Sequence, residues 1–242
     1  MLASALTVVI PAFNEAIRLP TLLAEFLPFL VTEPGLSILI VDDGSDPAHA
    51  QPILALVASY VATGRNIAVL RLPTNSGKGA ALALGFAQVQ TPYVGFIDAD
   101  GAVTAAEFMR LAYRATEGSG IDAVVASRVK MLGMLVERKL TRHLMGRVFA
   151  TCVSTLFDIP IYDSQCGCKI FRRDAVLPLL PLILSKGWLW DTQLIILLYV
   201  RRHVIIEVPV SWRDVPGSKV SLLWDPLRML YELWGFRRHL RR

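Results

Sequence analysis

Two aspartates separated by a single residue, Asp98 and Asp100, follow an apolar run in the middle of the chain. Successive side chains of a strand point to opposite faces, so both carboxylates can project to one side only where the strand ends and the chain turns. The neighbouring Ala99 and Gly101 are small and leave room for a ligand. Two convergent carboxylates suit a hard divalent cation, which commonly takes phosphate oxygens as further ligands. For an isolated pair of this kind, an acidic turn without any ligand is the alternative.

The first half of the chain alternates β-branched runs with longer helical patterns, which predicts a parallel sheet covered by helices on both faces. The expected strands are residues 6–10, 37–41, 67–70, 93–97 and 123–126, and the expected helices are residues 17–29, 48–63, 78–90 and 104–117. From residue 128 the pattern indicates a helical and irregular region with one final strand at 205–210. In open sheets of this class, ligands bind outside the carboxyl ends of the strands.

Polar and glycine-rich segments follow four successive strands of this predicted sheet. They are residues 11–15, 42–45, 75–79 and 98–101. Each segment alone is also explained as a helix cap or a turn, but four in succession predict a binding site at this edge. Residues 75–79 lack the full P-loop pattern, and no G-x-G-x-x-G follows the first strand. Both absences argue against a P-loop nucleotidase and a dinucleotide-dependent oxidoreductase.

The order and spacing of these segments resemble a known enzyme family. PAFNE (11–15), VDDGS (41–45), NSGKGAAL (75–82) and DADG (98–101) resemble the inverting nucleotide-sugar transferases of glycosyltransferase family 2. SRVK (127–130), DSQCGCKIF (163–171), WDTQ (190–193) and VSWRDVPGSKVS (210–221) resemble its polyprenyl-phosphate glycosyltransferases. DADGA, LMGRVF (144–149) and DSQCGCKIF are similar to the dolichyl-phosphate β-glucosyltransferase branch. The resemblance implies a GT-A fold, with a Rossmann-like, mostly parallel sheet and flanking helices.

For the donor side, the resemblance implies a nucleotide-sugar site followed by a metal site. The residues that it places around the uridine and the sugar are Pro11, Asn14, Glu15, Asp42, Asp43 and Lys78. A carboxylate such as that of Asp43 can accept the imide N–H of uracil or a ribose hydroxyl. Asp98 and Asp100 would hold Mg²⁺ or Mn²⁺ against the diphosphate and so assist departure of the nucleotide.

For the acceptor side, the resemblance implies a phosphate site built from basic residues. The residues assigned to it are Arg128, Arg142, Arg213, Ser218 and Lys219. The planar fork of arginine suits a phosphate, and the Pro216-Gly217 turn can present the last three. Arg138 lies four residues before Arg142, at helical spacing. For Arg138 and Arg147, a solvated basic face and a functional role remain equally open.

Gln165 and Asp191 complete the expected site, and Gln193 marks a departure from the family's motif. The resemblance implies that Gln165 orients the sugar or the metal-bound phosphates, although an ordinary turn residue is the alternative. Asp191 stands where the family keeps its acceptor-side carboxylate, a candidate general base. A prenyl phosphate is already largely ionised near neutral pH, with a second pKa of about 6, which favours orientation over deprotonation. Gln193 replaces the family's usual glutamate and leaves Asp191 the only carboxylate of this motif.

Residues 219–242 are expected to form an amphipathic helix after a catalytic domain at 1–218, whose nucleotide-sugar half is 1–127 and whose acceptor half is 128–218. Asp225 and Pro226 form a good helix start. Leu223, Leu227, Leu230, Tyr231 and Trp234 then fall on one apolar stripe, and four arginines follow in the last six residues. This pattern fits the membrane interface. A helix packed on the domain or on a second subunit, as in a homo-oligomer, is the alternative.

The composition limits where the protein can be located and which partners it can bind. The 242 residues contain 54% hydrophobic residues, with a mean hydropathy of +0.49. No run of about 18 apolar residues predicts a membrane span, and the N-terminus lacks a signal-peptide pattern. We therefore expect a cytoplasmic protein peripherally bound to the membrane. The net charge of +5 permits a phosphorylated substrate, an anionic membrane or a nucleic acid, of which we do not expect the last. Cys152, Cys166 and Cys168 are expected to be structural thiols.

The expected activity is transfer of a hexose, most simply glucose, from UDP-glucose to a polyprenyl phosphate with inversion and with a divalent metal. Two alternatives stay open. The first is a family 2 transferase with another donor, such as GDP-mannose, or with a soluble acceptor. The second is a nucleotide-sugar-binding protein without catalytic activity, which the loss of charge at Gln193 motivates.

Overall fold

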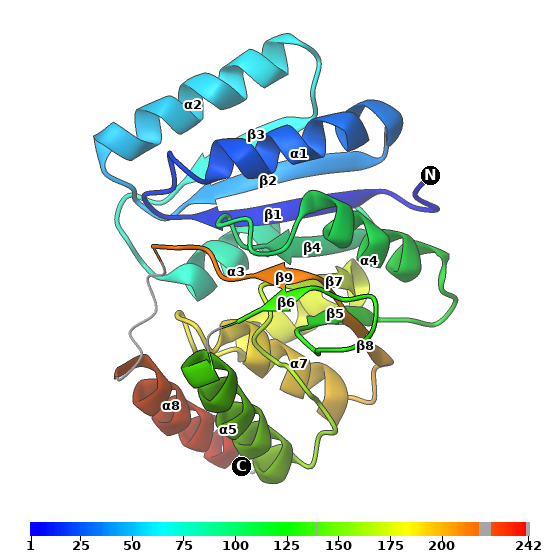
Figure 1. Cartoon of the computed structure of the whole chain (residues 1–242), viewed down its shortest axis with the longest axis vertical. Helices are drawn as coiled ribbons and strands as arrows, with labels where there is room; N and C mark the ends of the chain where they lie inside the picture. The colour runs from blue at the N-terminus through cyan, green and yellow to red at the C-terminus, as the bar shows by residue number, and fades with distance from the viewer. Residues whose placement is uncertain (139, 218–223, 241–242) are drawn as a thin grey trace.

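A computed structural model describes residues 1–138, 140–217 and 224–240. Its centre is a seven-stranded sheet in the order β3-β2-β1-β4-β7-β5-β8, with helices on both faces (Figure 1). The strands are β1 (Leu6–Ala12), β2 (Leu36–Asp42), β3 (Ile67–Arg71), β4 (Tyr93–Ile97), β5 (Ala123–Ser127), β7 (Cys168–Arg172) and β8 (Ile205–Pro209). Two short parallel strands, β6 (Val136–Glu137) and β9 (Trp212–Arg213), form a second sheet.

The helices are α1 (Leu19–Thr32), α2 (Pro47–Ala62), α3 (Lys78–Gln88), α4 (Ala105–Glu117), α5 (Leu140–Phe157), α6 (Arg173–Val176), α7 (Trp190–Val200) and α8 (Trp224–Leu240), together with the 3₁₀ helix η1 (Leu177–Leu182). All five strands and four helices expected in the first half are present, with their ends shifted by at most three residues. The predicted α/β architecture is therefore confirmed.

The sheet differs from the prediction in one strand that the sequence did not reveal. β7 lies between β4 and β5 and runs antiparallel to both, whereas the remaining neighbours pair in parallel. We expected only helical and irregular structure between residue 128 and the final strand. The strand is five residues long, with a lysine as its second residue and an arginine as its last, so neither its length nor its hydrophobic pattern distinguishes it from a loop.

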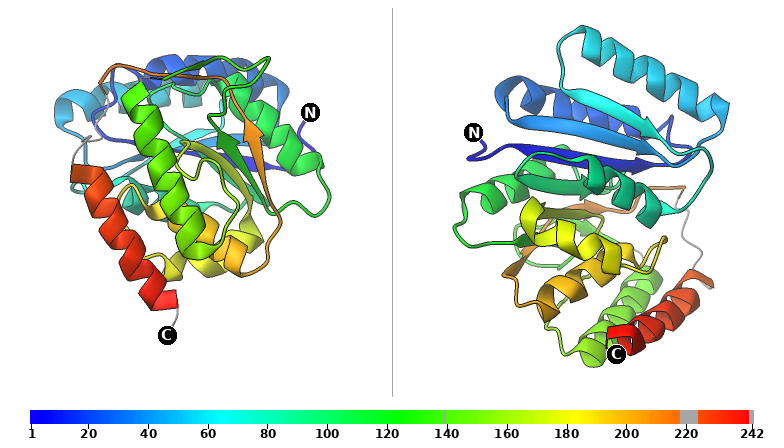
Figure 2. Two further views of the ribbon diagram at one scale, coloured as in Figure 1. Left: turned by 60° about the horizontal axis from the view of Figure 1, so that its bottom comes forward. Right: turned by 180° about the vertical axis from the view of Figure 1, so that it is seen from behind.

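Two apolar layers hold the helices on the sheet. α1, α2 and α4 pack on one face through residues such as Phe26, Ile53 and Phe108. On the other face, Phe86 of α3, Ile196 of α7 and the buried side of α5 belong to a second cluster, which continues into α8. Both views in Figure 2 show α5 and α8 side by side at the C-terminal end of the molecule. Within the described part of the chain, no helix is long and apolar enough to cross a membrane.

The C-terminal helix forms as expected but buries a different face. Met229, Leu233 and Phe236 pack against the protein, whereas Leu227, Tyr231 and Trp234 of the predicted stripe are 62%, 76% and 51% exposed. Leu223, the first residue of that stripe, and the expected boundary at 218/219 lie outside the described residues. The helix therefore contacts the domain while presenting a second apolar surface to its surroundings.

Candidate active site

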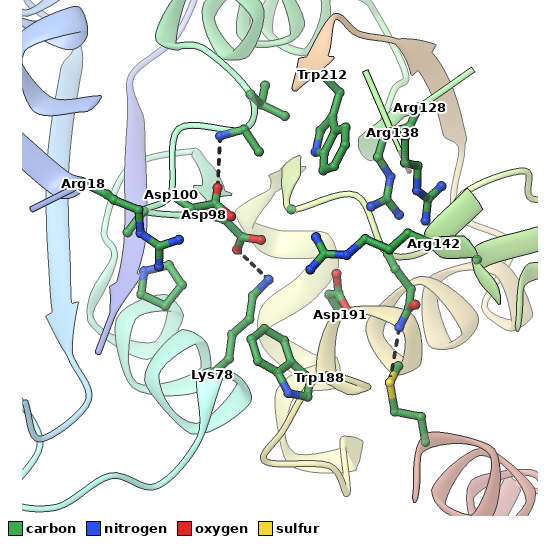
Figure 3. A pocket seen from close by; sticks show the side chains of 18 of the residues that line it. Arg18, Lys78, Asp98, Asp100, Arg128, Arg138, Arg142, Trp188, Asp191 and Trp212 are labelled. Atoms are coloured by element: carbon green, nitrogen blue, oxygen red, sulfur yellow. Dashed lines mark hydrogen bonds and ion pairs between the residues drawn. The ribbon is translucent and has the colours of Figure 1, made fainter. Parts of the chain in front are cut away.

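A cavity of about 290 Å³ opens at the carboxyl ends of β1 and β4 (Figure 3). Paired aspartates lie near its centre, and basic side chains lie on both sides of them. Its lining residues with polar or ionisable side chains include Glu15, Arg18, Lys78, Asp98, Asp100, Arg128, Arg138, Arg142, Gln165, Trp188 and Asp191. The predicted edge of the sheet is thus the site of the cavity.

Asp98 and Asp100 converge where β4 ends, as the sequence predicted. The Asp98 Oδ1 atom lies 2.5 Å from Lys78 Nζ, and Asp100 Oδ1 accepts a hydrogen bond from the Ala102 N–H at 3.0 Å. Burial and the neighbouring Asp98 raise the pKa of Asp100. A bound cation would offset the repulsion between the two carboxylates. In the described ranges, no three histidine, cysteine or acidic side chains are grouped so that they could hold a metal ion by themselves. The two carboxylates therefore fit a metal that takes its remaining ligands from a phosphorylated substrate.

Gly167 fixes the position of Asp98. Its carbonyl accepts a hydrogen bond from the Asp98 N–H at 2.9 Å. A Cβ atom at residue 167 would overlap the Asp98 carboxylate. The segment that leads into β7 thus packs directly under the first metal-site carboxylate, and only glycine leaves the space.

Lys78 begins α3 and projects into the cavity beneath Asp98. Its Nζ atom also lies 5.3 Å from the Phe96 ring centre and 5.6 Å from that of Trp188. Burial alone would lower the pKa of Lys78, but the carboxylates of Asp98 and Asp191 raise it above its ordinary value. The ammonium group therefore stays charged at neutral pH, and its predicted place beside the base and sugar stays a prediction.

The other predicted nucleotide-sugar residues divide into two groups. Pro11 and Glu15 line the cavity. The Asp43 carboxylate accepts hydrogen bonds from the N–H groups of Ser76 and Gly77 at 2.7 and 2.9 Å, so it positions the loop before α3. Asp42 contacts Ser45 and Arg71, and Asn14 contacts Ser45 and Asp46. These last three do not line the cavity, and their assignment to the uridine stays a prediction.

Arg18 is a cavity residue that sequence reasoning missed. Its guanidinium donates two hydrogen bonds to Glu15, at 2.7 and 2.5 Å. Hydrogen bonding to Glu15, together with the more distant Asp98 and Asp100, raises the pKa of Arg18 although burial opposes the change. The spacing of three between Glu15 and Arg18 at a helix start was the available signal.

On the acceptor side, the predicted arginines Arg128 and Arg142 line the cavity and are both paired with carboxylates. Arg128 donates to both oxygens of Asp163 at 2.6 and 2.7 Å and lies 5.6 Å from the Trp212 ring centre. Arg142 donates to Asp214 at 2.7 Å. Despite its burial, Asp163 has a pKa well below the usual range because of Arg128.

The remaining basic candidates differ in position. Arg138 lines the cavity, whereas Arg147 donates to the Tyr162 carbonyl and stacks on the Tyr162 ring at 3.9 Å. Arg213 is exposed and does not line the cavity. Ser218 and Lys219 lie outside the described residues, so their assignment to the phosphate stays a prediction, as does that of Arg213.

Asp191 lines the cavity from the first turn of α7 and forms a buried ion pair that the sequence did not predict. Lys169 of β7 is fully buried, and its Nζ atom lies 2.5 Å from Asp191 Oδ2 and 2.7 Å from the Cys166 carbonyl. Gln165 also lines the cavity, with its amide 3.7 Å from Met229 Sδ of α8. No local pattern signalled this pair, because the sequence did not mark residues 168–172 as a strand and the partner of Lys169 is 22 residues away.

Gln193 lies away from the cavity, although it follows Asp191 by only two residues. Its Oε1 atom accepts hydrogen bonds from the N–H groups of Leu184 and Ser185 at 2.9 and 3.0 Å. The neutral amide therefore holds the loop before α7. The substitution that separates this chain from the family's usual motif changes a structural contact outside the cavity, which weakens the argument for a non-catalytic protein.

The cysteines have the expected structural role. All three are free thiols, and burial raises the pKa of Cys166 to about 12 and that of Cys168 well above its usual value. Neither thiol is set up for reactivity at neutral pH.

The comparison with protein families decides the identification. The model described as "Glycosyl transferase family 2" matches residues 7–179. This chain belongs to glycosyltransferase family 2. The relatives of this family 2 transferase include the dolichyl-phosphate beta-glucosyltransferase of Saccharomyces cerevisiae, with 32% identity covering 94% of this chain and 72% of the yeast protein. The enzyme of the same name from Dictyostelium discoideum is 30% identical, covering 96% and 73%.

Solved structures agree in fold. Glucosyl-3-phosphoglycerate synthase from Mycobacterium tuberculosis in complex with UDP gives a TM-score of 0.71 at 18% identity, covering 97% of this chain and 80% of that chain. Its complex with Mn²⁺, UDP and glucosyl-3-phosphoglycerate gives 0.70 with the same coverage. The expected GT-A fold of this glycosyltransferase is therefore confirmed.

Replacing Gly167 with alanine tests how Asp98 is positioned. The new methyl group must displace the Asp98 carboxylate, so we expect G167A to slow glycosyl transfer by about 100-fold, as a displacement of about 1 Å can, and to weaken Mn²⁺ binding in the presence of UDP. The matched control is G235A, where a Cβ meets no atom within 4 Å. A folded G167A protein with the parent's rate and Mn²⁺ affinity would disprove this role.

Replacing Lys169 with methionine tests the buried ion pair. K169M leaves the buried Asp191 carboxylate without its counter-ion, which is expected to lower the free energy of unfolding by about 3–5 kcal/mol. The double variant K169M/D191L removes both charges and is expected to recover most of that loss. Urea unfolding measures both values, and equal stability of K169M and the parent would contradict the ion pair.

Proposed function

We propose that this glycosyltransferase moves glucose from UDP-glucose to the phosphate of a dolichyl-type polyprenyl phosphate, with inversion and with a divalent metal. The observation that carries the proposal is the division of one cavity into two sides. Asp98 and Asp100 lie at its centre with Arg18 on one side, and Arg128, Arg138 and Arg142 gather on the other (Figure 3). Such a cavity suits two phosphorylated substrates, and several relatives carry the name dolichyl-phosphate beta-glucosyltransferase.

The donor side is the side of the aspartates. Asp98 and Asp100 would hold Mg²⁺ or Mn²⁺, which, when bound, neutralises charge on the departing diphosphate. The related fold of glucosyl-3-phosphoglycerate synthase has been crystallised with Mn²⁺ and UDP, which supports this assignment. Lys78 adds a positive charge next to Asp98, where it can contact the sugar or its phosphates.

The acceptor side requires little proton transfer. An oxygen of the acceptor phosphate attacks the anomeric carbon from the face opposite the diphosphate. A new carbon–oxygen bond forms as the bond to UDP breaks, with inversion. Because a phosphate monoester is already mostly dianionic at neutral pH, no general base is needed. Asp191, held by Lys169, orients the acceptor instead of removing a proton.

The exposed apolar residues next to the cavity support binding to a membrane. α5 exposes Leu140, Leu144 and Val148 at spacings of four, and α8 exposes Leu227, Tyr231 and Trp234. Pro226 and Met229 of α8 line the cavity, so the helix that carries this apolar surface also forms part of the cavity wall. Arg237 and Arg238 in the last turn of α8 suit anionic head groups. A second subunit packed on α8 remains the alternative occupant.

A donor and acceptor screen tests the proposed reaction. In detergent with Mn²⁺ or Mg²⁺, we expect radiolabelled glucose to move from UDP-glucose to polyprenyl phosphate, and we expect chelation to abolish the transfer. D98A and D100A should each reduce the rate at least about 100-fold because the metal supplies several kcal/mol to the transition state. The matched control is D174N, whose side chain is 87% exposed and does not line the cavity.

Three results would contradict the proposal, each in a different way. Preference for GDP-mannose would show that the proposed donor, UDP-glucose, is wrong. Transfer to a soluble phosphorylated acceptor without any lipid would show that the proposed acceptor is wrong. Tight UDP binding without transfer to any acceptor would favour a nucleotide-sugar-binding protein.

Vesicle sedimentation tests the membrane surface. The variant L227S/Y231S/W234S removes exposed apolar side chains of α8 and is expected to lower partitioning onto phosphatidylcholine–phosphatidylserine vesicles about tenfold or more. The control L54S/V61S removes two exposed apolar side chains of α2. This helix packs on the opposite face of the sheet from α8. Equal partitioning of both variants and the parent would exclude α8 as the membrane contact.

A further inference from the structure

The charged side chains that line the cavity are almost all paired. Among the described residues, Arg18 pairs with Glu15, Lys78 with Asp98, and Asp191 with Lys169. Arg128 and Arg142 pair with Asp163 and Asp214, which lie behind the cavity wall. Two lining charges have no such partner in the described chain, the carboxylate of Asp100 and the guanidinium of Arg138. The first is accounted for by the metal, and the second has no role so far.

Arg138 is placed as a cation that lacks an anion. Its Nε atom is buried and has no hydrogen-bond partner. Gly146 of α5 makes room for its guanidinium, since a Cβ atom there would collide with it. Burial and the nearby Arg128 lower the pKa of Arg138 to about 10, so the group remains charged at neutral pH. A buried donor and charge without a partner cost folding free energy, which favours a role in ligand binding.

Arg138 lies on the acceptor side of the cavity. The charged groups nearest in effect to Arg138 are Arg128, Asp163 and Arg142, all on the acceptor side, whereas Arg18 and Lys78 are influenced by both Asp98 and Asp100. Figure 3 shows Arg138 next to Arg128, across the cavity from Arg18. An anion bound by Arg138 would therefore lie apart from a diphosphate held at the aspartates.

We propose that Arg138 binds the phosphate monoester of the acceptor and supplies the uncompensated positive charge of the acceptor pocket. The inference rests on the proposed function, in which the acceptor is a phosphate. Arg128 and Arg142 contribute donors whose charge is already balanced by Asp163 and Asp214, so they shape the pocket more than they attract an anion. The planar guanidinium of Arg138 suits two phosphate oxygens at once through its terminal nitrogens.

Kinetics of R138Q and R138K test the proposal, with R147Q as the matched control from the same basic segment. A short-chain polyprenyl phosphate serves as acceptor in detergent. R138Q is expected to raise the KM for this acceptor about 10- to 100-fold, the range for a lost charge-assisted hydrogen bond, while the affinity for UDP with Mn²⁺ stays within about twofold. R138K, which keeps the charge but not the fork, should lie between R138Q and the parent. R147Q should match the parent.

Thermal unfolding separates binding from a structural role. Without ligand, R138Q should unfold at the parent's temperature or above, because it removes an unpaired buried charge. A lowered midpoint together with weakened binding of UDP and acceptor alike would assign Arg138 to structure and overturn the inference. An unchanged acceptor KM in R138Q would also overturn it. If the parent itself uses no polyprenyl phosphate, the proposed function fails instead. Binding of inorganic phosphate to the parent, measured by calorimetry and lost only in R138Q, would then still support an anion site at Arg138.

Discussion

The antiparallel entry of β7 between β4 and β5 is the constraint on which the site depends. It places Gly167 against Asp98, so that the backbone next to one strand positions the first of the two carboxylates proposed to hold the metal. It also buries Lys169 within reach of Asp191 at the start of α7. The donor-side and acceptor-side carboxylates are therefore held by one short strand, and a change in its register would move both.

Most charged side chains that line the cavity are held by ion pairs, and two of them, within the described part of the chain, are not. Lys78, Arg18, Arg128 and Arg142 each have a carboxylate partner, which keeps their long side chains in one place without leaving a large net charge. The unpaired groups, Asp100 and Arg138, have opposite signs and lie on different sides. A metal ion with the donor diphosphate would balance the charge of Asp100, and an acceptor phosphate would balance the charge of Arg138. Binding of both substrates would therefore neutralise the two charges that the folded protein leaves unpaired. Such pre-organisation favours in-line attack because the reacting groups need little rearrangement.

The sequence predicted the parts of this arrangement that repeat locally. The alternation of strands and helices gave the sheet, and the polar segments after successive strands located the edge that carries the cavity. What it missed depends on contacts between distant residues. Lys169 lies in a strand that the sequence did not reveal, and its pairing with Asp191 follows only from the fold that brings β7 next to the start of α7. Gln193 was recognised only as a departure from the family's motif, and the sequence did not show that its amide turns away from the cavity and holds Leu184 and Ser185. In the part of the chain that the structure describes, Arg128 is paired and Arg138 is not because Asp163 contacts only the first of them, and no local pattern links Asp163 to either arginine.

The central claim is that one cavity holds the metal with the donor diphosphate and, separately, the acceptor phosphate. A crystal structure of the chain with Mn²⁺, UDP and a short-chain polyprenyl phosphate tests it most directly. The account predicts anomalous density for Mn²⁺ between the Asp98 and Asp100 carboxylates and the UDP phosphates, with the acceptor phosphate on Arg138 and the prenyl chain directed toward α8. Metal density away from both aspartates, or an acceptor phosphate bound outside this cavity, would contradict it.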